Sequence, residues 1–329
     1  MAEVLLEIKD LKVTFDSRFG VVKALNGIDL QIHKGESLGI VGESGSGKSV
    51  TALSLLRLLS PNATVSAQSI MFEGENLLQK SENEMLKIRG RKISMIFQDA
   101  SSSLNPVLTV GRQVEEAFIL HSQFAKKARR EKLIDILRLV GIPDPTLNMK
   151  GYPHQFSGGM NQRIMIAIAI SCNPSLMIAD EPTTALDVTT QAQILDLLKH
   201  LIDEKQTSLL MITHDFGIVK ELCERVCVMY GGEILEEGYA KDVLFSPFHP
   251  YTQGLINCIP KVESGDQTLR GIPGEAAKGT NLPSGCVFHP RCEKVKEICV
   301  EEKPALVTTG NHKVRCFRFD TNKRDRWKQ

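Results

Sequence analysis

The pattern of apolar and polar residues along this chain predicts an α/β fold. Residues Leu5 to Thr14 alternate between the two classes, as a half-buried edge strand does, and Val22 to Ile32 continues as a second strand region with Asn26-Gly27 as a turn signal. Short apolar runs, typical of strands buried on both faces, occur at Ser37 to Val41, Ile70 to Phe72, Ile93 to Phe97, Leu176 to Asp180, Leu209 to Thr213 and Val226 to Tyr230. Apolar residues at helical spacing predict helices over 50–59, 109–140 and 164–170.

Turn and loop signals separate these elements. Gly231-Gly232 joins the last apolar run to Glu233 to Glu236, which predicts a hairpin. The Ser-rich stretch 99–106 is expected to be a loop. The long helical stretch carries the basic run Lys126-Lys127-Ala128-Arg129-Arg130, which indicates a solvated helix face.

The first buried strand leads into a glycine-rich run with the spacing of a phosphate-binding P-loop, Gly42-Glu43-Ser44-Gly45-Ser46-Gly47-Lys48-Ser49. Its glycines let the backbone curl around an anion with N–H groups pointing inward. The helix that follows offers its own N–H groups and its positive dipole end to the same phosphates. Lys48 would reach the β- and γ-phosphates of a nucleotide, and the Ser49 hydroxyl would bind Mg²⁺. With a strand before it and a helix after it, this run predicts a nucleoside triphosphate site.

Two aromatic residues near the N-terminus are candidates for the adenine base. Phe15 and Phe19 lie in a predicted loop between the first two strand regions, over 15–20. Either ring could stack on a flat base, and the alternative is that both fill a hydrophobic edge. We favour Phe15 for the nucleotide, with Phe19 as the other candidate.

Polar residues after three further predicted elements could complete the site. Ser157-Gly158-Gly159 at the start of a helix is a second potential anion site, although Ser157 could simply cap that helix. An acid at the end of a buried strand beside a P-loop commonly holds nucleotide-bound Mg²⁺, which suggests Asp180, and Glu181 could polarise the attacking water. His214 follows another buried strand and could contact the γ-phosphate, although a lone histidine is more often structural.

Composition and charge narrow the functional classes. A formal net charge of +1 argues against a nucleic-acid protein that binds through a large positive field. No stretch approaches the ~20 apolar residues of a membrane span, and the N-terminal residues lack the features of a signal peptide. We therefore expect a cytoplasmic chain that reaches a membrane through a partner. In that compartment its cysteines are not expected to form disulfides.

In their order along the chain, these motifs resemble the ATP-binding subunit of ABC transporters. The matching residues are the P-loop, Gln98, Ser157-Gly158-Gly159-Met160-Asn161-Gln162, Asp180-Glu181, Ala185-Leu186-Asp187 and His214. The position after Met160 is commonly basic in the family and is Asn161 here. The resemblance implies a head-to-tail dimer in which each ATP lies between the P-loop of one subunit and the signature, residues 157–162, of the other. It also implies that Gln98 links Mg²⁺ to the helical insertion, that Asp187 makes a contact across the dimer and that His214 senses the γ-phosphate.

These expectations define a fold and a set of sites. The expected fold is α/β: a RecA-like P-loop ATPase core over 1–98 and 166–245, a helical subdomain over 99–165 ending in the signature, and a C-terminal extension over 246–329. The expected catalytic residues are Glu181, His214, Gln98 and Lys48. Those expected to hold Mg²⁺ are Ser49, Gln98 and Asp180. Those expected to bind ATP are Phe15, Gly42, Ser44, Gly45, Ser46, Gly47, Lys48, Ser49, Val50, Gln98, Asp180, Ser157, Gly159, Gln162 and Asp187.

Within that family the chain looks most like the ATPases of dipeptide and oligopeptide importers. The residues that carry this likeness are Phe97-Gln98-Asp99 with Ser103-Leu104-Asn105-Pro106, His249-Pro250-Tyr251-Thr252 with Leu255, and the tail from Gly285 to Cys292. The likeness implies a peripheral protein on the cytoplasmic face of the cell membrane. Its implied partners are a homologous ATPase, two permeases that dock on the helical insertion and, indirectly, an external peptide-binding protein. The alternatives are a non-transport ABC ATPase of the DNA repair or translation type, an exporter subunit, or an ATPase for another substrate such as nickel.

Four cysteines cluster near the C-terminus: Cys286, Cys292, Cys299 and Cys316. Structural zinc commonly uses cysteine pairs separated by two to four residues, and no such pair occurs here. Four thiolates with looser spacing can hold a [4Fe–4S] cluster, which is what the resemblance to peptide importers implies. His289 and His312 keep a mixed zinc site open, and reduced thiols are the third alternative. A metal would compensate for the small core of a loop-rich extension.

Overall fold

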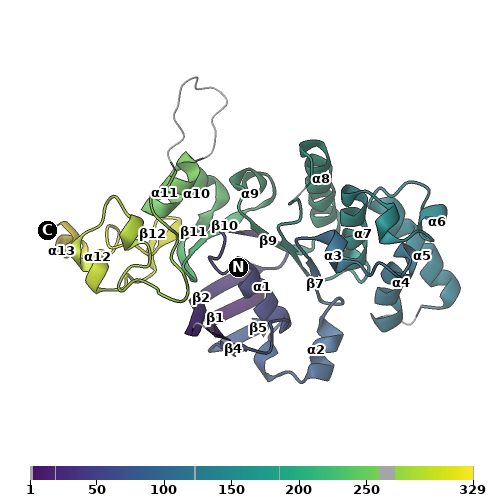
Figure 1. The fold of residues 1–329 in the computed structure, drawn as a ribbon, viewed down its shortest axis with the longest axis horizontal. Helices are drawn as coiled ribbons and strands as arrows, with labels where there is room; N and C mark the ends of the chain where they lie inside the picture. The colour runs from purple at the N-terminus through teal and green to yellow at the C-terminus, as the bar shows by residue number, and fades with distance from the viewer. Residues whose placement is uncertain (1–2, 19, 122–123, 185, 259–270, 329) are drawn as a thin grey trace. The chain divides into compact units, whose positions relative to one another are not determined.

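The computed structural model describes residues 3–18, 20–121, 124–184, 186–258 and 271–328. The chain divides into two compact units. The first, here the P-loop unit, comprises 5–31, 38–76 and 213–329, and the second, here the helical unit, comprises 1–4, 32–37 and 77–212. Strands and helices occur in both units, as Figure 1 shows, so the expected α/β class is confirmed.

The first sheet of the P-loop unit is antiparallel, with strand order β2-β1-β5-β6 and β4 also paired to β1. Its strands are β1 (Val4–Ser17), β2 (Gly20–His33), β4 (Ala63–Ser66), β5 (Ser69–Phe72) and β6 (Glu75–Asn76). Alternate residues of β1 such as Leu6 and Ile8 are buried, and they lie opposite Phe72 and Ile70 of β5. The alternation predicted the strand correctly. The expectation of an edge strand was wrong, because β1 has neighbours on both sides.

The second sheet of the P-loop unit holds the strand that precedes the P-loop. Its order is β12-β13-β11-β10-β3, with β10 parallel to β3 and the other pairs antiparallel. The predicted hairpin is confirmed as β10 and β11, and β13 pairs with β11, so the C-terminal extension continues this sheet. The strands are β3 (Ser37–Val41), β10 (Arg225–Tyr230), β11 (Glu233–Tyr239), β12 (Val307–Thr309) and β13 (His312–Val314).

Helices in the P-loop unit are short. They are α1 (Lys48–Leu56), α9 (Phe216–Leu222), α10 (Ala240–Phe245), α11 (Pro250–Asn257), η3 (His289–Arg291), α12 (Glu297–Glu301) and α13 (Arg324–Lys328). Helix α1 ends earlier than the apolar pattern predicted, because Arg57 adopts a left-handed conformation and its N–H bonds back to the last turn.

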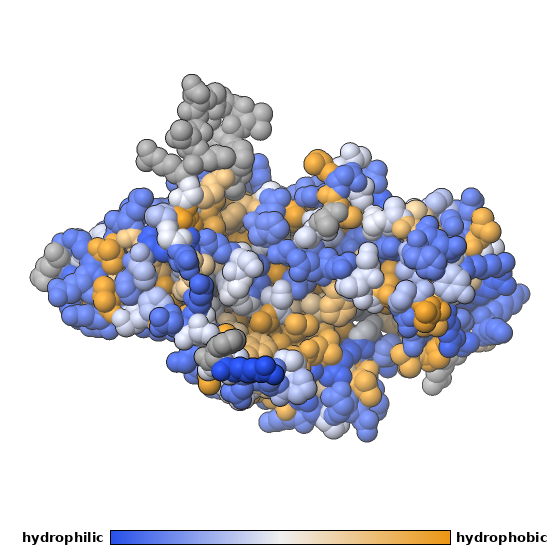
Figure 2. Space-filling view, in the orientation of Figure 1, coloured by the Kyte–Doolittle hydropathy of each residue, from blue (hydrophilic) through white to orange (hydrophobic). Residues whose placement is uncertain are grey.

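The helical unit contains three parallel strands in the order β9-β8-β7, and its helices α4 to α7 contact one another as a group (Figure 1). Its strands are β7 (Ile93–Ile96), β8 (Leu176–Asp180) and β9 (Ser208–Thr213). Its helices are η1 (Leu77–Gln79), α2 (Glu82–Ile88), α3 (Ala100–Ser103), α4 (Val110–His121), α5 (Lys126–Leu139), α6 (Pro145–Asn148), η2 (Pro153–Gln155), α7 (Gly158–Ile170) and α8 (Val188–Lys205). In Figure 2 the visible face over α4 to α6 is mostly hydrophilic, with separate hydrophobic residues. This agrees with the solvated basic face expected for α5.

Tertiary contacts overrode two turn and loop predictions in the P-loop unit. Asn26-Gly27 does not turn the chain but lies inside β2, where the Asn26 amide donates to the carbonyl of Gly231 at 2.9 Å. Phe15 is not in a loop either, because β1 continues to Ser17 and Phe15 lies opposite Ala63 of β4. Phe19, the other candidate for the base, lies outside the described residues.

Two further predictions in the helical unit were wrong in detail. The predicted loop 99–106 contains α3, which begins because the Asp99 carboxylate accepts the N–H of Ser101 at 2.8 Å. The long helix expected over 109–140 is divided into α4 and α5. No described helix has both the length and the apolar character needed to cross a membrane.

Candidate functional site

The P-loop connects β3 to α1 and its backbone forms a cradle around the Lys48 side chain. Lys48 Nζ donates to the carbonyl oxygens of Gly42 at 2.8 Å and Glu43 at 3.1 Å, and the side chain is buried. Gly47 caps α1 in a left-handed conformation. The buried Ser46 Oγ has no hydrogen-bond partner among the described residues. A buried hydroxyl beside an ammonium group at a helix N-terminus fits a phosphate oxygen.

Two glycines of this loop are required by the close approach of other strands. A Cβ atom at position 42 would lie 2.2 Å from the carbonyl oxygen of Met229, and one at position 47 would lie 2.8 Å from that of Ala24. Gly232 N–H donates to Ser46 O at 3.1 Å, so the β10–β11 turn supports the loop. The remaining predicted loop residues are exposed at Ser44 and Gly45 and half-buried at Ser49 and Val50.

Two other predicted nucleotide contacts belong to the P-loop unit. Phe15 is half-buried in β1. His214 is exposed directly after β9, and the next residue, Asp215, caps α9 by accepting the N–H of Gly217 at 2.6 Å. A nucleotide role for either remains a prediction.

In the helical unit, parallel pairing brings Gln98 and Glu181 together. Strands β7 and β8 run side by side with Ile96 opposite Ala179, so the residues after their carboxyl ends are neighbours. Glu181 Oε2 accepts hydrogen bonds from Gln98 Nε2 at 3.1 Å and from the Thr184 hydroxyl at 3.0 Å. The carboxylate is therefore fixed in orientation. The sequence pattern missed Thr184, although its place three residues after Glu181 was a local signal.

Asp180 and the backbone of Glu181 lie at the end of β8. Asp180 is buried, and it pairs with Ile212 of β9. Glu181 N–H donates to Ile212 O at 2.8 Å, while its φ of +46° places the residue in the left-handed region. A non-glycine residue in that region is uncommon and points to a functional constraint at the end of this strand.

The signature begins α7. Ser157 Oγ accepts the N–H of Met160 at 3.3 Å, so the capping role weighed for this serine is present. Gln162 is buried and its Nε2 has no hydrogen-bond partner among the described residues. A Cβ atom at Gly159 would lie 2.5 Å from Cγ2 of Thr190, so this glycine lets α7 approach α8.

Asp187 lies beside the signature in the same unit. Its carboxylate accepts the N–H of Thr190 at 2.9 Å and the Thr190 hydroxyl at 2.7 Å, and these bonds hold the pKa of Asp187 below its usual range. Thr190 therefore touches both Gly159 and Asp187. The two family motifs that were predicted to face a partner subunit are neighbours in the helical unit.

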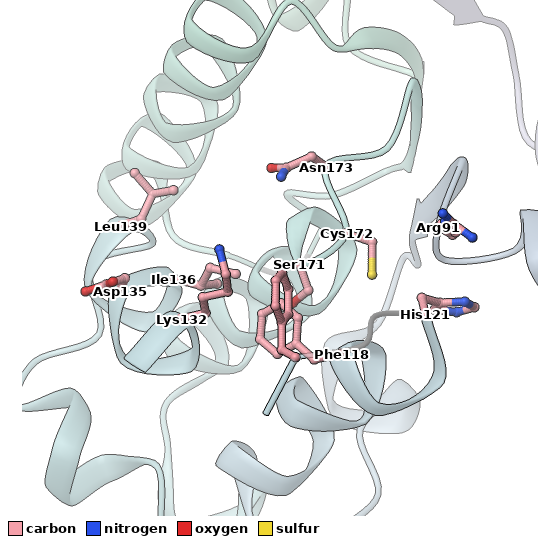
Figure 3. Close-up of a pocket in the computed structure, with 11 residues that line it drawn as sticks. Arg91, Phe118, His121, Lys132, Asp135, Ile136, Leu139, Ser171, Cys172 and Asn173 are labelled. Carbon is pink, nitrogen blue, oxygen red and sulfur yellow. The ribbon is translucent and has the colours of Figure 1, made fainter. Parts of the chain in front are cut away.

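A cavity of about 450 Å³ opens among the helices of this unit (Figure 3). Lys132, Ile136 and Leu139 of α5 line one side, and the segment after α7 and the end of α4 line the other. Of the two phenylalanines that line the cavity, Phe118 is buried, whereas Phe124 is 39 % exposed. Burial, followed by the charge of Arg91, lowers the pKa of His121 at the rim. The cavity is partly apolar and rimmed by charged groups.

The four C-terminal cysteines are neighbours in the P-loop unit, because the thiols of the other three act on the pKa of Cys286. Burial, together with the other three thiols, raises the pKa of Cys286 to about 12. Burial followed by neighbouring thiols raises the pKa of Cys316 to about 11, and burial also raises that of Cys292. Among the described residues, no group of three or more His, Cys, Asp or Glu side chains is found that could hold a metal ion.

The two histidines considered for a zinc site have other partners. His312 Nδ1 lies 3.1 Å from a carboxylate oxygen of Glu236, and both residues are buried. His289 Nδ1 lies 3.0 Å from Cys286 O and 3.1 Å from Ser284 O. Of the other cysteines, Cys223 and Cys227 are buried, whereas Cys172 and Cys258 are half-buried.

The chain is similar to known ATP-binding proteins of ABC transporters. Residues 25–184 match the ABC transporter family, and residues 235–299 match the C-terminal region of oligopeptide/dipeptide transporters. The chain is 46 % identical over 318 residues to the oligopeptide transport ATP-binding protein AppD of Bacillus subtilis, covering 96 % of this chain and 97 % of that protein. It is 47 % identical over 312 residues to the dipeptide transport ATP-binding protein DppD of Haemophilus influenzae, covering 95 % of this chain and 94 % of that protein.

A solved structure supports the fold. The dimeric post-hydrolysis form of the ATP-binding cassette MJ0796 with bound ADP and Pi has a TM-score of 0.64 and 30 % identity to this chain. The similarity covers 71 % of this chain and 98 % of that one. The expected cassette fold is therefore confirmed.

Proposed function

The chain belongs to the ABC transporter family of ATP-binding proteins, and we infer that it is the ATP-hydrolysing subunit of a dipeptide or oligopeptide importer. It hydrolyses ATP, and this hydrolysis powers peptide uptake. The observation that carries the assignment is similarity to peptide transport ATP-binding proteins over nearly the full chain, including the C-terminal region 235–299. That region disfavours the alternatives of a non-transport ATPase, an exporter subunit and an ATPase for another substrate.

We propose that the P-loop binds the triphosphate through Lys48, the unpartnered Ser46 hydroxyl and the first N–H groups of α1. The buried Lys48 ammonium now bonded to backbone carbonyls supplies a positive charge, and the glycines leave room for phosphate oxygens. Family membership supports Ser49, Gln98 and Asp180 as the Mg²⁺ ligands, and the metal would neutralise charge on the phosphates. Phe15 is the candidate for the base, and His214 for the γ-phosphate.

Glu181 is the proposed base for the attacking water. A general base must accept a proton at a fixed position. Hydrogen bonds from Gln98 and Thr184 orient the Glu181 carboxylate. The transfer is an in-line attack of water on the γ-phosphorus, in which the water loses a proton to Glu181 and the bond to the ADP oxygen breaks. Charge neutralisation and positioning supply most of the catalysis.

We propose that the signature completes the site of a second, homologous ATPase. The N-terminus of α7 carries the free N–H groups and positive dipole end that suit phosphate, and the unpartnered Gln162 Nε2 is a further donor. Ser157, Gly159 and Gln162 would therefore contact the partner's nucleotide, with Asp187 next to them. An isolated P-loop leaves one side of the triphosphate in water, so a second subunit would add binding energy and ATP would close the dimer.

The helical unit is the proposed contact for the permeases, on the cytoplasmic face of the membrane. The cavity among α4, α5 and the end of α7 is shown in Figure 3. Its lining is partly apolar and includes the exposed Phe124 ring. Replacing Phe124 with Asp should weaken recovery of permeases, whereas the matched change at Leu147, an exposed residue of α6 that does not line the cavity, should not. Equal recovery with both variants would contradict this docking site.

We propose that Cys286, Cys292, Cys299 and Cys316 hold a [4Fe–4S] cluster. What supports the proposal is that the thiols of Cys292, Cys299 and Cys316 all act on the pKa of Cys286, so the four residues are neighbours in the P-loop unit. A tetrahedral zinc ion with Zn–S bonds of about 2.3 Å needs its sulfurs within about 4 Å of one another. A cluster with four separate iron atoms takes thiolates that are further apart. The cluster would cross-link the extension, and the thiols would lose their protons on binding.

Elemental analysis of anaerobically purified protein tests this site. Iron and sulfide in equal amounts and a brown colour are expected, and Cys299→Ser should lose iron while Cys172→Ser, in the helical unit, should keep it. Zinc without iron would reject the cluster.

The importer assignment is tested by affinity isolation of the tagged chain from membranes. We expect recovery of a homologous ATPase and two polytopic permeases, and, with the assembled complex, ATP hydrolysis stimulated by a peptide-loaded external binding protein. A preparation that contains no membrane subunit would contradict the assignment.

A further inference from the structure

Two segments that are distant in sequence both contact one residue of the P-loop, Glu43. The N–H of Glu43 donates to the Tyr251 hydroxyl at 2.9 Å. The Glu43 carboxylate accepts two hydrogen bonds from the Arg291 guanidinium, at 2.6 Å and 3.0 Å. Tyr251 belongs to the run 249–252, and Arg291 lies directly before Cys292 in the C-terminal extension. All three residues belong to the P-loop unit.

The Arg291 side chain is held in one orientation by further contacts. Its Nε donates to Pro273 O at 2.8 Å and its Nη2 to Ile272 O at 3.2 Å. The guanidinium carbon also lies 5.7 Å from the centre of the Tyr230 ring, and the side chain is 5 % exposed. Two backbone carbonyls and the Glu43 carboxylate accept hydrogen bonds from the planar guanidinium of Arg291. The position of this group is therefore fixed before any nucleotide binds.

An aromatic cluster packs beside the two residues that contact Glu43, Tyr251 and Arg291. The rings of Tyr230 and Tyr251 have centroids 4.7 Å apart, and Phe288 lies 5.4 Å from the first and 5.2 Å from the second. Tyr251 and Phe288 are buried. These closely packed rings leave the Tyr251 hydroxyl little freedom to move away from the P-loop.

Glu43 in turn helps to set the shape of the P-loop. Its carbonyl oxygen accepts hydrogen bonds from Lys48 Nζ at 3.1 Å and from Ser46 N–H at 3.2 Å. Its carboxylate would otherwise place a negative charge in a loop that receives a triphosphate, and a paired arginine offsets that repulsion. Arg291 therefore acts on the phosphate site in two ways, through loop geometry and through charge.

We propose that Arg291 and Tyr251 are positioning residues that hold the P-loop in its nucleotide-binding shape, so that the cysteine-bearing extension sets the affinity of this chain for ATP. This inference rests on the proposed ATPase function. Neither residue is expected to touch the nucleotide. Both act through Glu43, which explains why an ATPase core carries an extension bonded to its phosphate loop.

Titration of the full-length chain with a fluorescent ATP analogue and Mg²⁺ tests the proposal. Arg291→Met should raise the Kd about tenfold, equivalent to about 1.4 kcal/mol. Arg291→Lys should give a smaller increase, because a lysine keeps the charge and loses the fork geometry. Tyr251→Phe removes the hydroxyl that accepts the Glu43 N–H and should also weaken binding. Adding Glu43→Gln to Arg291→Met should recover affinity, since the second change removes the uncompensated carboxylate.

Arg315→Met is the matched control, with thermal stability measured in parallel. Arg315 is also a poorly exposed arginine of the extension, but it donates to Ile234 O and pairs with Glu233 rather than with the P-loop. The Arg315→Met variant should have a lower melting temperature than the wild-type chain and the same Kd for the ATP analogue. A folded Arg291→Met or Arg291→Lys protein with the wild-type Kd, or the same Kd change with Arg315→Met, would overturn the proposal. The Lys48→Ala variant distinguishes failure of this proposal from failure of the proposed ATPase function. If the wild-type chain binds the ATP analogue no better than this variant, the ATPase function itself is contradicted.

Discussion

Glu181→Gln removes the proposed catalytic base while preserving the local structure. Glu181 Oε2 accepts one hydrogen bond from Gln98 and one from Thr184, and the residue's own N–H is bonded to Ile212 O. The amide oxygen of a glutamine can accept the same two bonds, and the backbone bond is unchanged. The substitution therefore removes negative charge and basicity and keeps these three hydrogen bonds.

The expected size of the effect follows from the role of the residue. General base catalysis contributes about 10²- to 10⁴-fold to a rate, or about 2.7–5.5 kcal/mol of activation free energy. The ionised Glu181 carboxylate has no hydrogen to donate to a phosphate oxygen. Its loss should therefore change the Kd for ATP by less than about twofold. Because ATP would persist in the site, the variant should also accumulate as the closed dimer.

Phosphate release by the assembled importer, measured in a single turnover, gives the rate of the chemical step. Sedimentation in the presence of ATP measures the fraction of the protein that is dimeric. Thr184→Val is the matched control, because it removes one hydrogen bond to Glu181 and leaves the carboxylate, and it should cost only a few-fold, consistent with one hydrogen bond of about 1 kcal/mol. The reasoning is refuted if Glu181→Gln keeps more than about a tenth of the wild-type rate, or if Thr184→Val loses as much.

Three further predictions concern the P-loop unit. Lys48→Ala should reduce ATP affinity by more than about tenfold, because a buried ammonium that faces the phosphates is lost; titration with a fluorescent analogue showing wild-type affinity would contradict this. Gly42→Ala should destabilise the fold by at least about 1–3 kcal/mol, since its Cβ would lie 2.2 Å from Met229 O, and an unchanged denaturant midpoint would be inconsistent with that overlap. Burial lowers the pKa of His249 to about 3 while its Nδ1 accepts the N–H of Tyr251. Unfolded histidine binds a proton near pH 6.5, so stability should be full above that pH and fall by about 1.4 kcal/mol per unit below it, down to about pH 3. His249→Asn should remove this contribution, and identical slopes for the two proteins would refute it.

Several elements could be predicted from the sequence because their signals are local. The strands β8 and β9 are continuous apolar runs, and such runs are buried on both faces in a parallel sheet. The P-loop is one contiguous motif whose glycine spacing fixes its shape. The cap of α7 at Ser157 also depends on residues within one helical turn. In each case the residues that decide the structure are a few positions apart.

Other features depended on residues far away in the chain. Asn26-Gly27 has the sequence of a turn, yet it lies in β2 because Gly231 and Gly232 bond to it. The pair between Glu43 and Arg291 joins residues separated by 248 positions, and neither has a local pattern that marks the other. Charges and hydrogen-bonding groups find their partners only when the chain is folded, because a bonded pair is defined by distance in space. Local residue spacing therefore specifies the phosphate-binding motif with its flanking strands and helices, whereas folding brings together the distant side chains that hold that motif in place.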